Sequence, residues 1–327
     1  MARPRKALVR RQATPPVTPA FLDDLAAAAE LAAARHAPRT RVAYTKDLER
    51  FATWRQERGR AHEPVGPADV AAYLQACLKA GHRAASITRY RAALGSRYPG
   101  AAKAAEVAAV LAGIRRTAGT APRRRAAFTT EQLRDAAAAF AREGTVRAVR
   151  DRAMLLVAVA AGGLRRSELV ALRVGDVRRA ARGLLLSIRR AKTDQEAAGQ
   201  EREIALGTTP RTCPVAALDA WLARHPEPDN PGAAIFRAVD RHGNVRGPLD
   251  ARAIHALARR VATALGLDTS EYGAHSLRAS YATLAYRSGL PEVEVMRHGG
   301  WRSAQVMRRY VREAERWSVN FTRAVGL

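Results

Sequence analysis

Three short segments, far apart in the chain, carry side chains that bind anions and move protons. Arg165 follows a Gly-Gly pair and has Glu168 three residues on, a helical spacing that by itself is ordinarily a surface ion pair. His275 precedes Arg278 by the same spacing, which puts an imidazole and a guanidinium on one side of a helix. The third segment begins Gly-Gly-Trp and reaches Tyr310 nine residues after the tryptophan. Each pattern alone is a weak indication of function, so the order of all three along the chain is the stronger indication.

The charge of the chain indicates a polyanion as its partner. Its 327 residues include 56 Lys and Arg against 30 Asp and Glu, a net charge of +26. When Lys and Arg side chains neutralise the phosphates of a nucleic acid, the counterions condensed on those phosphates are released, which favours binding. A basic ribosomal or nucleoid protein would have the same balance, so charge alone does not separate these classes.

The chain gives no sign of a metal centre, a nucleotide loop or a membrane segment. Cys77 and Cys213 are far apart and have no clustered histidine, so we expect buried roles for both and no zinc site. No GxxxxGK[ST] sequence occurs. No apolar run approaches the roughly 18 residues that span a bilayer. We therefore expect a soluble, cytoplasmic protein.

The elements that must position these side chains fall into two groups. Residues 1–17 predict a mobile basic arm, and residues 18–116 an all-helical domain. Its expected helices begin near Pro19, Thr40, Pro67, Ser86 and Val107. Residues 117–127 lack an apolar period and contain a proline and three consecutive arginines, which is typical of a linker.

A second domain is predicted over residues 128–327. In the middle of this domain the spacing of apolar residues no longer follows a helical period. Residues 184–188 and 202–206 there predict two short strands joined by a polar turn that contains glycine. Helical patterns resume at Val215 and continue nearly to the end. The expected fold class is mainly α with a small antiparallel β-sheet.

The ordered set of candidate residues resembles the tyrosine recombinase, or phage integrase, family. The set is Arg165 with Glu168, Lys192 in the hairpin, His275 with Arg278, Trp301 and Tyr310. The family more commonly has histidine at the Trp301 position, and tryptophan after Gly-Gly is similar to its Cre-like members. The resemblance implies a two-domain DNA clamp, in which a helical, SAM-like core-binding domain precedes an α+β catalytic domain.

The resemblance also implies a role for each residue. Arg165 and Arg278 would hold the non-bridging phosphate oxygens. His275 would accept the proton of the Tyr310 nucleophile, and Trp301 would donate a hydrogen bond to the phosphate. Lys192 would protonate the departing 5′ oxygen, and Glu168 would support the arginines. Strand exchange through a 3′-phosphotyrosine needs no cofactor and no metal.

The implied partner is double-stranded DNA with a specific target site, bound by a homo-tetramer. A C-terminal helix that carries Trp317 and Phe321 would dock into a neighbouring protomer; the alternative is that both rings pack on their own domain. Candidate DNA contacts are Arg83, Arg89, Arg91, Arg123, Arg124, Arg125 and Arg241.

Two other functions fit the same residues. A topoisomerase or telomere resolvase on this fold would relax or hairpin DNA without exchanging partners. A catalytically silent DNA-binding protein would keep the pattern without the chemistry.

Overall fold

The computed structural model describes residues 18–34, 38–119, 125–189, 199–315 and 322. Contacts within the chain divide it into two compact units, Met1–Pro122 and Arg123–Leu327, and each is described by itself. Several predictions fall outside the described residues: the arm 1–17, Arg123, Arg124, Lys192, Trp317 and Phe321.

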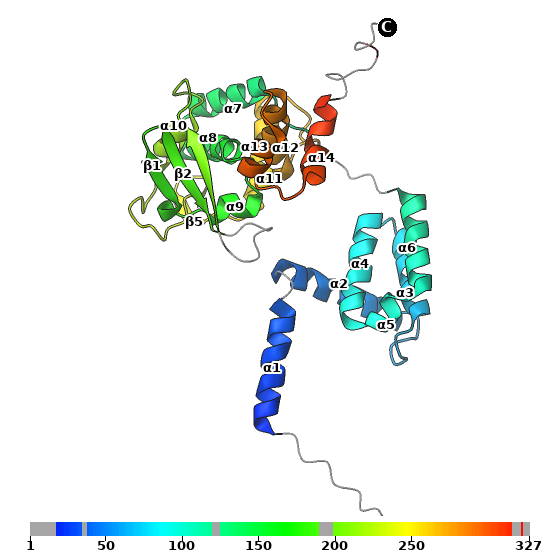
Figure 1. The fold of residues 1–327 in the computed structure, drawn as a ribbon. Coiled ribbons are helices and arrows are strands. Elements are labelled where there is room, and N and C mark those ends of the chain that lie inside the picture. The colour runs from blue at the N-terminus through cyan, green and yellow to red at the C-terminus, as the bar shows by residue number, and fades with distance from the viewer. Residues whose placement is uncertain (1–17, 35–37, 120–124, 190–198, 316–321, 323–327) are drawn as a thin grey trace, which may run out of the picture. The chain divides into compact units, whose positions relative to one another are not determined.

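The first unit is helical throughout its described part (Figure 1). Its helices are α1 Pro19–Ala34, α2 Pro38–Gln56, α3 Pro67–Lys79, α4 Ala84–Arg97, α5 Pro99–Ala102 and α6 Ala105–Ala118. Proline opens α1, α2, α3 and α5, where its missing N–H removes no helical hydrogen bond. The five helices expected from the apolar period are confirmed, and the short α5 is an addition.

Aromatic rings form the centre of this unit's core. Phe51 of α2 and Tyr73 of α3 meet edge to face with ring centroids 5.0 Å apart, and Trp54 lies 5.4 Å from Tyr73. Apolar side chains at helical spacing complete the core: Val70, Leu74, Ile87, Leu94, Val107, Leu111 and Ile114. The periodic positions of the sequence are therefore the buried ones.

One predicted helix start is wrong. The sequence favours Ser86 as the cap of the fourth helix, but α4 begins at Ala84, and Arg83 has the extended backbone of the cap position. The Ser86 N–H instead donates to the Arg83 carbonyl within the first turn. The capping rule failed because this helix starts without a side-chain cap.

The second unit combines helices with two small sheets. Its helices are α7 Thr130–Glu143, α8 Val146–Ala160, α9 Arg166–Ala171, η1 Val174–Asp176, α10 Pro214–Leu222, α11 Ala253–Ala264, α12 Ala274–Arg287, α13 Glu292–Gly299 and α14 Ala304–Glu315. Its strands are β1 Val177–Ala180, β2 Gly183–Ile188, β3 Gln200–Ala205, β4 Arg237–Val239 and β5 Val245–Pro248. In the described ranges, no helix is long and apolar enough to cross a membrane.

The two predicted strands are β2 and β3, which pair antiparallel with Leu184 opposite Ile204 and Leu186 opposite Arg202. The sequence did not indicate β1, which pairs on the other side of β2, or the separate β4–β5 hairpin. Strand β1 is four residues long and mostly exposed, so its residues lack the apolar alternation that marks a strand.

The main core of this unit surrounds α8. Its residues Met154, Leu155 and Val157 are buried, and the helix contacts α7, α10 and α12. A second, smaller cluster joins α12, α13 and α14 through Ala282, Ala285, Val295, Trp301, Met307 and Val311. Trp301 and the adjacent Tyr310 belong to this smaller cluster and its edge.

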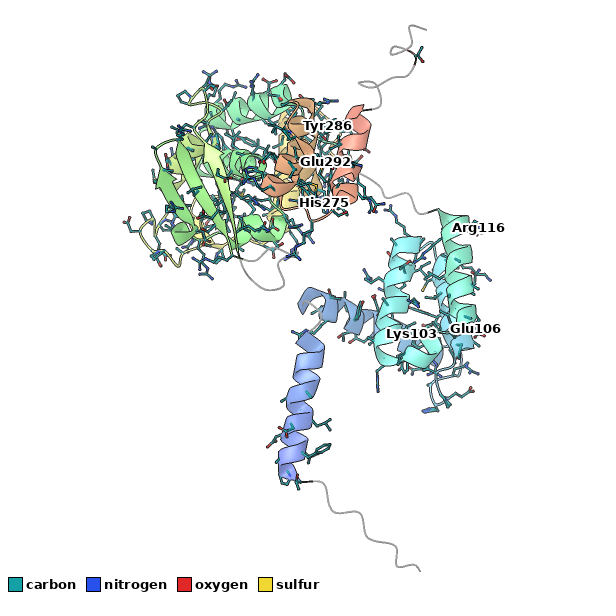
Figure 2. All side chains as sticks on the ribbon, viewed as in Figure 1. Lys103, Glu106, Arg116, His275, Tyr286 and Glu292 are labelled. Carbon is teal, nitrogen blue, oxygen red and sulfur yellow. The ribbon has the colours of Figure 1, made fainter. Side chains whose placement is uncertain are left out.

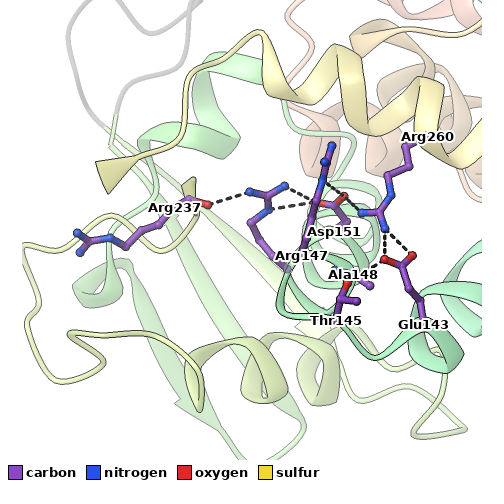
Figure 3. A network of polar contacts seen from close by, with 8 residues as sticks. Glu143, Thr145, Arg147, Ala148, Asp151, Arg237 and Arg260 are labelled. Atoms are coloured by element: carbon purple, nitrogen blue, oxygen red, sulfur yellow. Dashed lines mark hydrogen bonds and ion pairs between the residues drawn. The ribbon is translucent and has the colours of Figure 1, made fainter. Parts of the chain in front are cut away.

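A network of charged side chains around the buried Asp151 fastens α8 to its neighbours (Figure 3). Asp151, which is 1% exposed, accepts hydrogen bonds from Arg150 and from Arg260 of α11. Arg260 also donates to Glu143 at the end of α7, and Arg150 to the Arg237 carbonyl. Each of these two cations thus has a carboxylate partner.

Candidate active site

A glycine pair brings two distant segments together. Helix α8 ends at Ala160, and Gly162 and Gly163 follow with φ angles of 85° and 69°. A Cβ atom on Gly163 would lie 2.8 Å from the Arg278 Cα, and one on Gly162 would overlap the His298 carbonyl. Only glycine fits, because the backbone is left-handed and other backbone fills the space. The turn therefore sets the start of α9 against α12.

Arg165 occupies the cap position of α9 rather than its first turn. The Glu168 carboxylate accepts the Arg165 backbone N–H at 2.8 Å and its guanidinium Nη1 at 2.5 Å. Glu168 is buried, whereas the Arg165 side chain is 22% exposed. The carboxylate thus holds the arginine in place while the arginine keeps an accessible part.

Arg278 is buried although it is charged, with 4% of its surface exposed. Its Nη1 donates to the Gly163 carbonyl and its Nη2 to the Gly299 carbonyl, both at 2.8 Å. Its guanidinium carbon lies 3.7 Å from the centroid of the Trp301 ring, a cation–π contact. Burial, followed by repulsion from Arg165, lowers the pKa of Arg278 to about 10. The side chain therefore remains a cation at neutral pH.

Trp301 projects from a second glycine pair. Helix α13 ends at Gly299, and Gly300 follows in the left-handed conformation with φ 64°. A side chain on Gly299 would overlap the indole ring. The ring is buried and stacks on Tyr281 with centroids 6.0 Å apart and planes at 10°. Both neighbours, Tyr281 and Arg278, fix the plane of the indole.

Tyr310 lies on α14 beside Trp301, with ring centroids 5.8 Å apart. Its side chain is partly buried against the small cluster of α12, α13 and α14. Its carbonyl accepts a hydrogen bond of 3.1 Å from Thr283 Oγ1, which ties α14 to α12 at this residue. The phenol is near enough to Arg278 to act on the pKa of that arginine. It is thus not sealed in apolar packing.

His275 is exposed at the N-terminal end of α12 (Figure 2). Ser276 anchors that end, because its buried Oγ accepts the Gly273 N–H at 3.1 Å. His275 and the buried Arg278 stand three residues apart on the helix, as predicted. The imidazole remains accessible while the guanidinium does not.

Lys192 lies outside the described residues, but the strands on both sides of its loop are described. Ile188 of β2 pairs with Gln200 of β3 at the end of the ladder. The loop between these residues therefore leaves the sheet at that end. The position of Lys192 stays a prediction.

Sequence reasoning missed one charged residue of this region, Arg202 on β3. It is 6% exposed, and its Nη1 donates to the Arg297 carbonyl at 3.0 Å. Strand alternation gave a signal, since Arg202 shares the inward face of the strand with Ile204. An arginine on the apolar face of a predicted strand was the clue.

Two of the three candidate DNA contacts in the first unit, Arg89 and Arg91, have partners within the protein. The Arg89 guanidinium donates to the buried Asp47 carboxylate at 2.8 and 3.0 Å. Arg91 Nε donates to the Ala102 carbonyl at 3.1 Å, and Arg83 stands at the start of α4. Their contacts with DNA stay predictions.

Two candidates in the second unit, Arg125 and Arg241, lie among the described residues. Arg241 is in the β4–β5 turn, where its Nε donates to His242 Nε2 at 3.0 Å. Arg125 donates to the Ser270 carbonyl. Arg241 is exposed and Arg125 is partly buried, and their roles also stay predictions.

Comparison with protein families identifies the class. Residues 126–316 match the model of the Phage integrase family, and residues 20–104 match that of the Phage integrase, N-terminal SAM-like domain. The first match alone covers more than half of the chain. The chain belongs to the phage integrase family and is a tyrosine site-specific recombinase, which confirms the predicted fold class and function.

Particular relatives agree with this assignment. The chain is 27% identical over 286 residues to the integrase/recombinase xerD homolog of Selenomonas ruminantium, covering 85% of this chain and 82% of that protein. It is 27% identical over 164 residues to recombinase cre of Escherichia phage P1, covering 46% of each chain.

Solved structures share the fold. XerH site-specific recombinase bound to a palindromic difH substrate has a TM-score of 0.56 at 17% identity, over 82% of this chain and 74% of that one. A lambda integrase tetramer bound to a Holliday junction has a TM-score of 0.58 at 18% identity, over 92% and 80%.

Proposed function

We propose that Tyr310 is the nucleophile of this recombinase. Its oxygen attacks the scissile phosphate, the bond to the 5′ oxygen breaks, and a 3′-phosphotyrosyl link and a free 5′ hydroxyl result. That hydroxyl, or the one of a partner duplex, attacks the link and releases the phenol. The phosphate ester is conserved at each step, so exchange needs no nucleotide.

The observation that carries the proposal is the convergence of side chains from separate elements. Arg278 contacts the Trp301 ring at 3.7 Å, and Tyr310 lies 5.8 Å from that ring. Arg165 is close enough to Arg278 to lower its pKa. A nucleophile, a hydrogen-bond donor and two anion-binding groups thus share one region.

The charge of this region suits a phosphate in reaction. The transition state gathers negative charge on the non-bridging oxygens, and fixed guanidiniums stabilise that charge without having to reorganise. Nearby positive charge also favours the phenolate of Tyr310 over the phenol. The Trp301 indole N–H is a further donor for the phosphate. Glu168 supports this arrangement through Arg165 and does not react.

Two residues handle protons in this proposal. His275, accessible at the start of α12, accepts the phenol proton when DNA is bound. Lys192, on the β2–β3 loop, protonates the departing 5′ oxygen. The two proton transfers keep charge from building up on either the entering or the leaving oxygen.

The proposed partner is double-stranded DNA with a specific site. The helical unit and the catalytic unit would clamp the duplex, with the seven candidate arginines in contact with the DNA. We further propose a homo-tetramer on DNA, assembled through the C-terminal segment with Trp317 and Phe321. The lambda integrase relative was solved as a tetramer on a Holliday junction, which supports this assembly. The enzyme would work on the nucleoid in the cytoplasm.

The experiment begins with selection of bound fragments from random DNA, which supplies a cognate site. A nicked suicide substrate built on that site should trap a covalent adduct with the wild-type chain and none with Tyr310→Phe. Phosphotyrosine mapped to another residue would contradict the assignment of the nucleophile.

The same material separates the alternatives. Exchange of strands between two labelled duplexes supports a recombinase. Relaxation of supercoiled DNA that lacks the site, without exchange, supports a topoisomerase-like enzyme. Tight binding to the selected site with no adduct supports a silent DNA-binding protein.

A further inference from the structure

Arg202 is a buried cation whose hydrogen bonds go to neutral groups. Its Nη1 donates to the Arg297 carbonyl at 3.0 Å, and its Nη2 donates to Gln200 Oε1. Its Nε is buried and has no hydrogen-bond partner in the described part of the chain. Glu168 and Glu203 raise its pKa, but they form their ion pairs with Arg165 and Arg297. Burial outweighs them and lowers the pKa of Arg202.

Such an arrangement costs folding free energy, because a buried guanidinium loses hydration that carbonyl oxygens replace only in part. Arg150 has the same exposed fraction, 6%, in the same unit. Yet Arg150 donates to the Asp151 carboxylate through both Nε and Nη2. A purely structural role for Arg202 would be expected to follow that pattern, so its own bonding requires another explanation.

The contacts of Arg202 lead to the turn that carries Trp301. The Arg297 carbonyl belongs to the last turn of α13, directly before the glycine pair. A Cβ atom on Gly300 would overlap Arg202 Nη2, so the guanidinium packs directly on the backbone of that turn. Because Trp301 is the next residue, Arg202 sets the position from which the indole reaches Arg278.

The charge of Arg202 also acts on the candidate active site. It lowers the pKa of Arg278, and Arg165 in turn lowers the pKa of Arg202. The guanidiniums of Arg165, Arg202 and Arg278 therefore repel one another. Of the three, Arg165 is the one that forms an ion pair with Glu168. A bound phosphate relieves this repulsion, so the third cation strengthens the attraction for the scissile phosphate.

Arg202 does not itself bind the phosphate in this arrangement. Its Nε is enclosed and its guanidinium packs on the backbone of the Gly299–Gly300 turn, whereas the guanidinium of Arg278 lies against the Trp301 ring, beside Tyr310. Its action must pass through the residues that it supports. This separates it from Arg165, whose side chain is 22% exposed.

We infer that Arg202 is a positioning residue for strand cleavage: it clamps the Gly299–Gly300 turn to β3, so that Trp301 and Arg278 meet correctly, and adds a third positive charge behind the phosphate. The inference rests on the proposed function.

The test compares Arg202→Gln with the matched control Arg150→Gln. Single-turnover cleavage of the suicide substrate is measured at saturating DNA and at a temperature where both variants are folded. We expect Arg202→Gln to lower the cleavage rate by on the order of 100-fold, as a misplaced donor does, with little change in DNA affinity. Arg150→Gln should destabilise the fold and leave the cleavage rate near the wild-type value. Equal cleavage rates for the two variants would overturn the inference.

A double-mutant cycle tests the route of action. If Arg202 acts through Trp301, the losses in cleavage rate of Arg202→Gln and Trp301→Phe should not add, and the double variant should resemble the slower single variant. Additive losses would reject positioning of Trp301. Should Arg202→Gln fail to fold, Arg202→Lys serves in both comparisons, since it retains the charge and loses the planar fork. Adduct formation by the wild-type chain is measured first, so failure of the proposed function is recognised separately.

Discussion

The second unit contains two groups of arginines with different bonding. Around Asp151, Arg150 and Arg260 both donate to carboxylates, and Glu143 adds a second acidic group (Figure 3). Around Glu168, only Arg165 does so, whereas Arg202 and Arg278 donate to carbonyl and amide oxygens. The difference indicates that this protein neutralises cations that hold helices together and leaves positive charge uncompensated at the site where we propose that the phosphate binds.

Removing Arg278 should have the largest effect. We expect Arg278→Gln to reduce single-turnover cleavage by roughly 1,000-fold or more, the scale reported for an arginine that stabilises a transferring phosphoryl group. The matched change Arg260→Gln, in the neutralised group, should weaken folding and leave cleavage by the folded protein near wild type. The rate of adduct formation at saturating DNA measures both. Similar losses in the two variants would erase the distinction between the groups.

Removing the carboxylate instead of an arginine tests the group around Asp151. Asp151→Asn leaves Arg150 and Arg260 without their shared carboxylate, and we expect the free energy of unfolding to fall by about 3–5 kcal/mol. Urea denaturation followed by circular dichroism measures the change. Folded Asp151→Asn should still form the covalent adduct at the wild-type rate. A slow but stable variant would show that this group also takes part in cleavage.

Alanine substitutions at Gly163 and at the control position Gly144 test the close contact between the Gly163 turn and the Arg278 backbone. Gly163→Ala puts a Cβ atom 2.8 Å from the Arg278 Cα at a left-handed position, and we expect about 1–3 kcal/mol of strain together with slower cleavage. Gly144, at φ 63°, has no atom nearer than 3.9 Å to such a Cβ. Gly144→Ala should therefore reduce the melting temperature without affecting cleavage. Loss of cleavage in Gly144→Ala would mean that the effect is global.

The smallest expected effect is stabilisation by a simple anion. Sulfate should raise the melting temperature by more than chloride at equal ionic strength, because it binds the uncompensated guanidiniums in the folded state only; at about 10 times its Kd the gain is about 1.4 kcal/mol. Differential scanning fluorimetry measures it. Arg278→Gln should lose the difference between the salts, and Arg260→Gln should retain it. A response that is the same in both variants would locate the anion elsewhere.

Much of the fold follows from local patterns. The apolar period located the helices around Phe51, Tyr73 and Ile87, and alternation located β2 and β3. The period could not locate β1 or the β4–β5 hairpin, because short and mostly exposed strands bury too little apolar surface to mark them. The helix start predicted at Ser86 was wrong because α4 has Arg83 at its cap position and begins without a side-chain cap.

The candidate site shows the same division. The motif order predicted Arg165, Arg278, Trp301 and Tyr310, and the fold brings them into one region. Strand alternation marks Arg202 as an inward-facing charge, but its contact with the Arg297 carbonyl, a backbone atom 95 residues away in the chain, could not be predicted from the sequence. Every residue has a backbone carbonyl, so a sequence motif does not show which carbonyl accepts a hydrogen bond.

The two glycine pairs have a consequence for engineering. Side chains at Gly162, Gly163, Gly299 and Gly300 would each meet backbone, the indole ring or the Arg202 guanidinium. A library that seeks new DNA specificity should therefore hold these codons constant and place its diversity at the arginines proposed to contact DNA. Sampling these four codons would fill the library with inactive clones whose defect has nothing to do with the DNA sequence being selected.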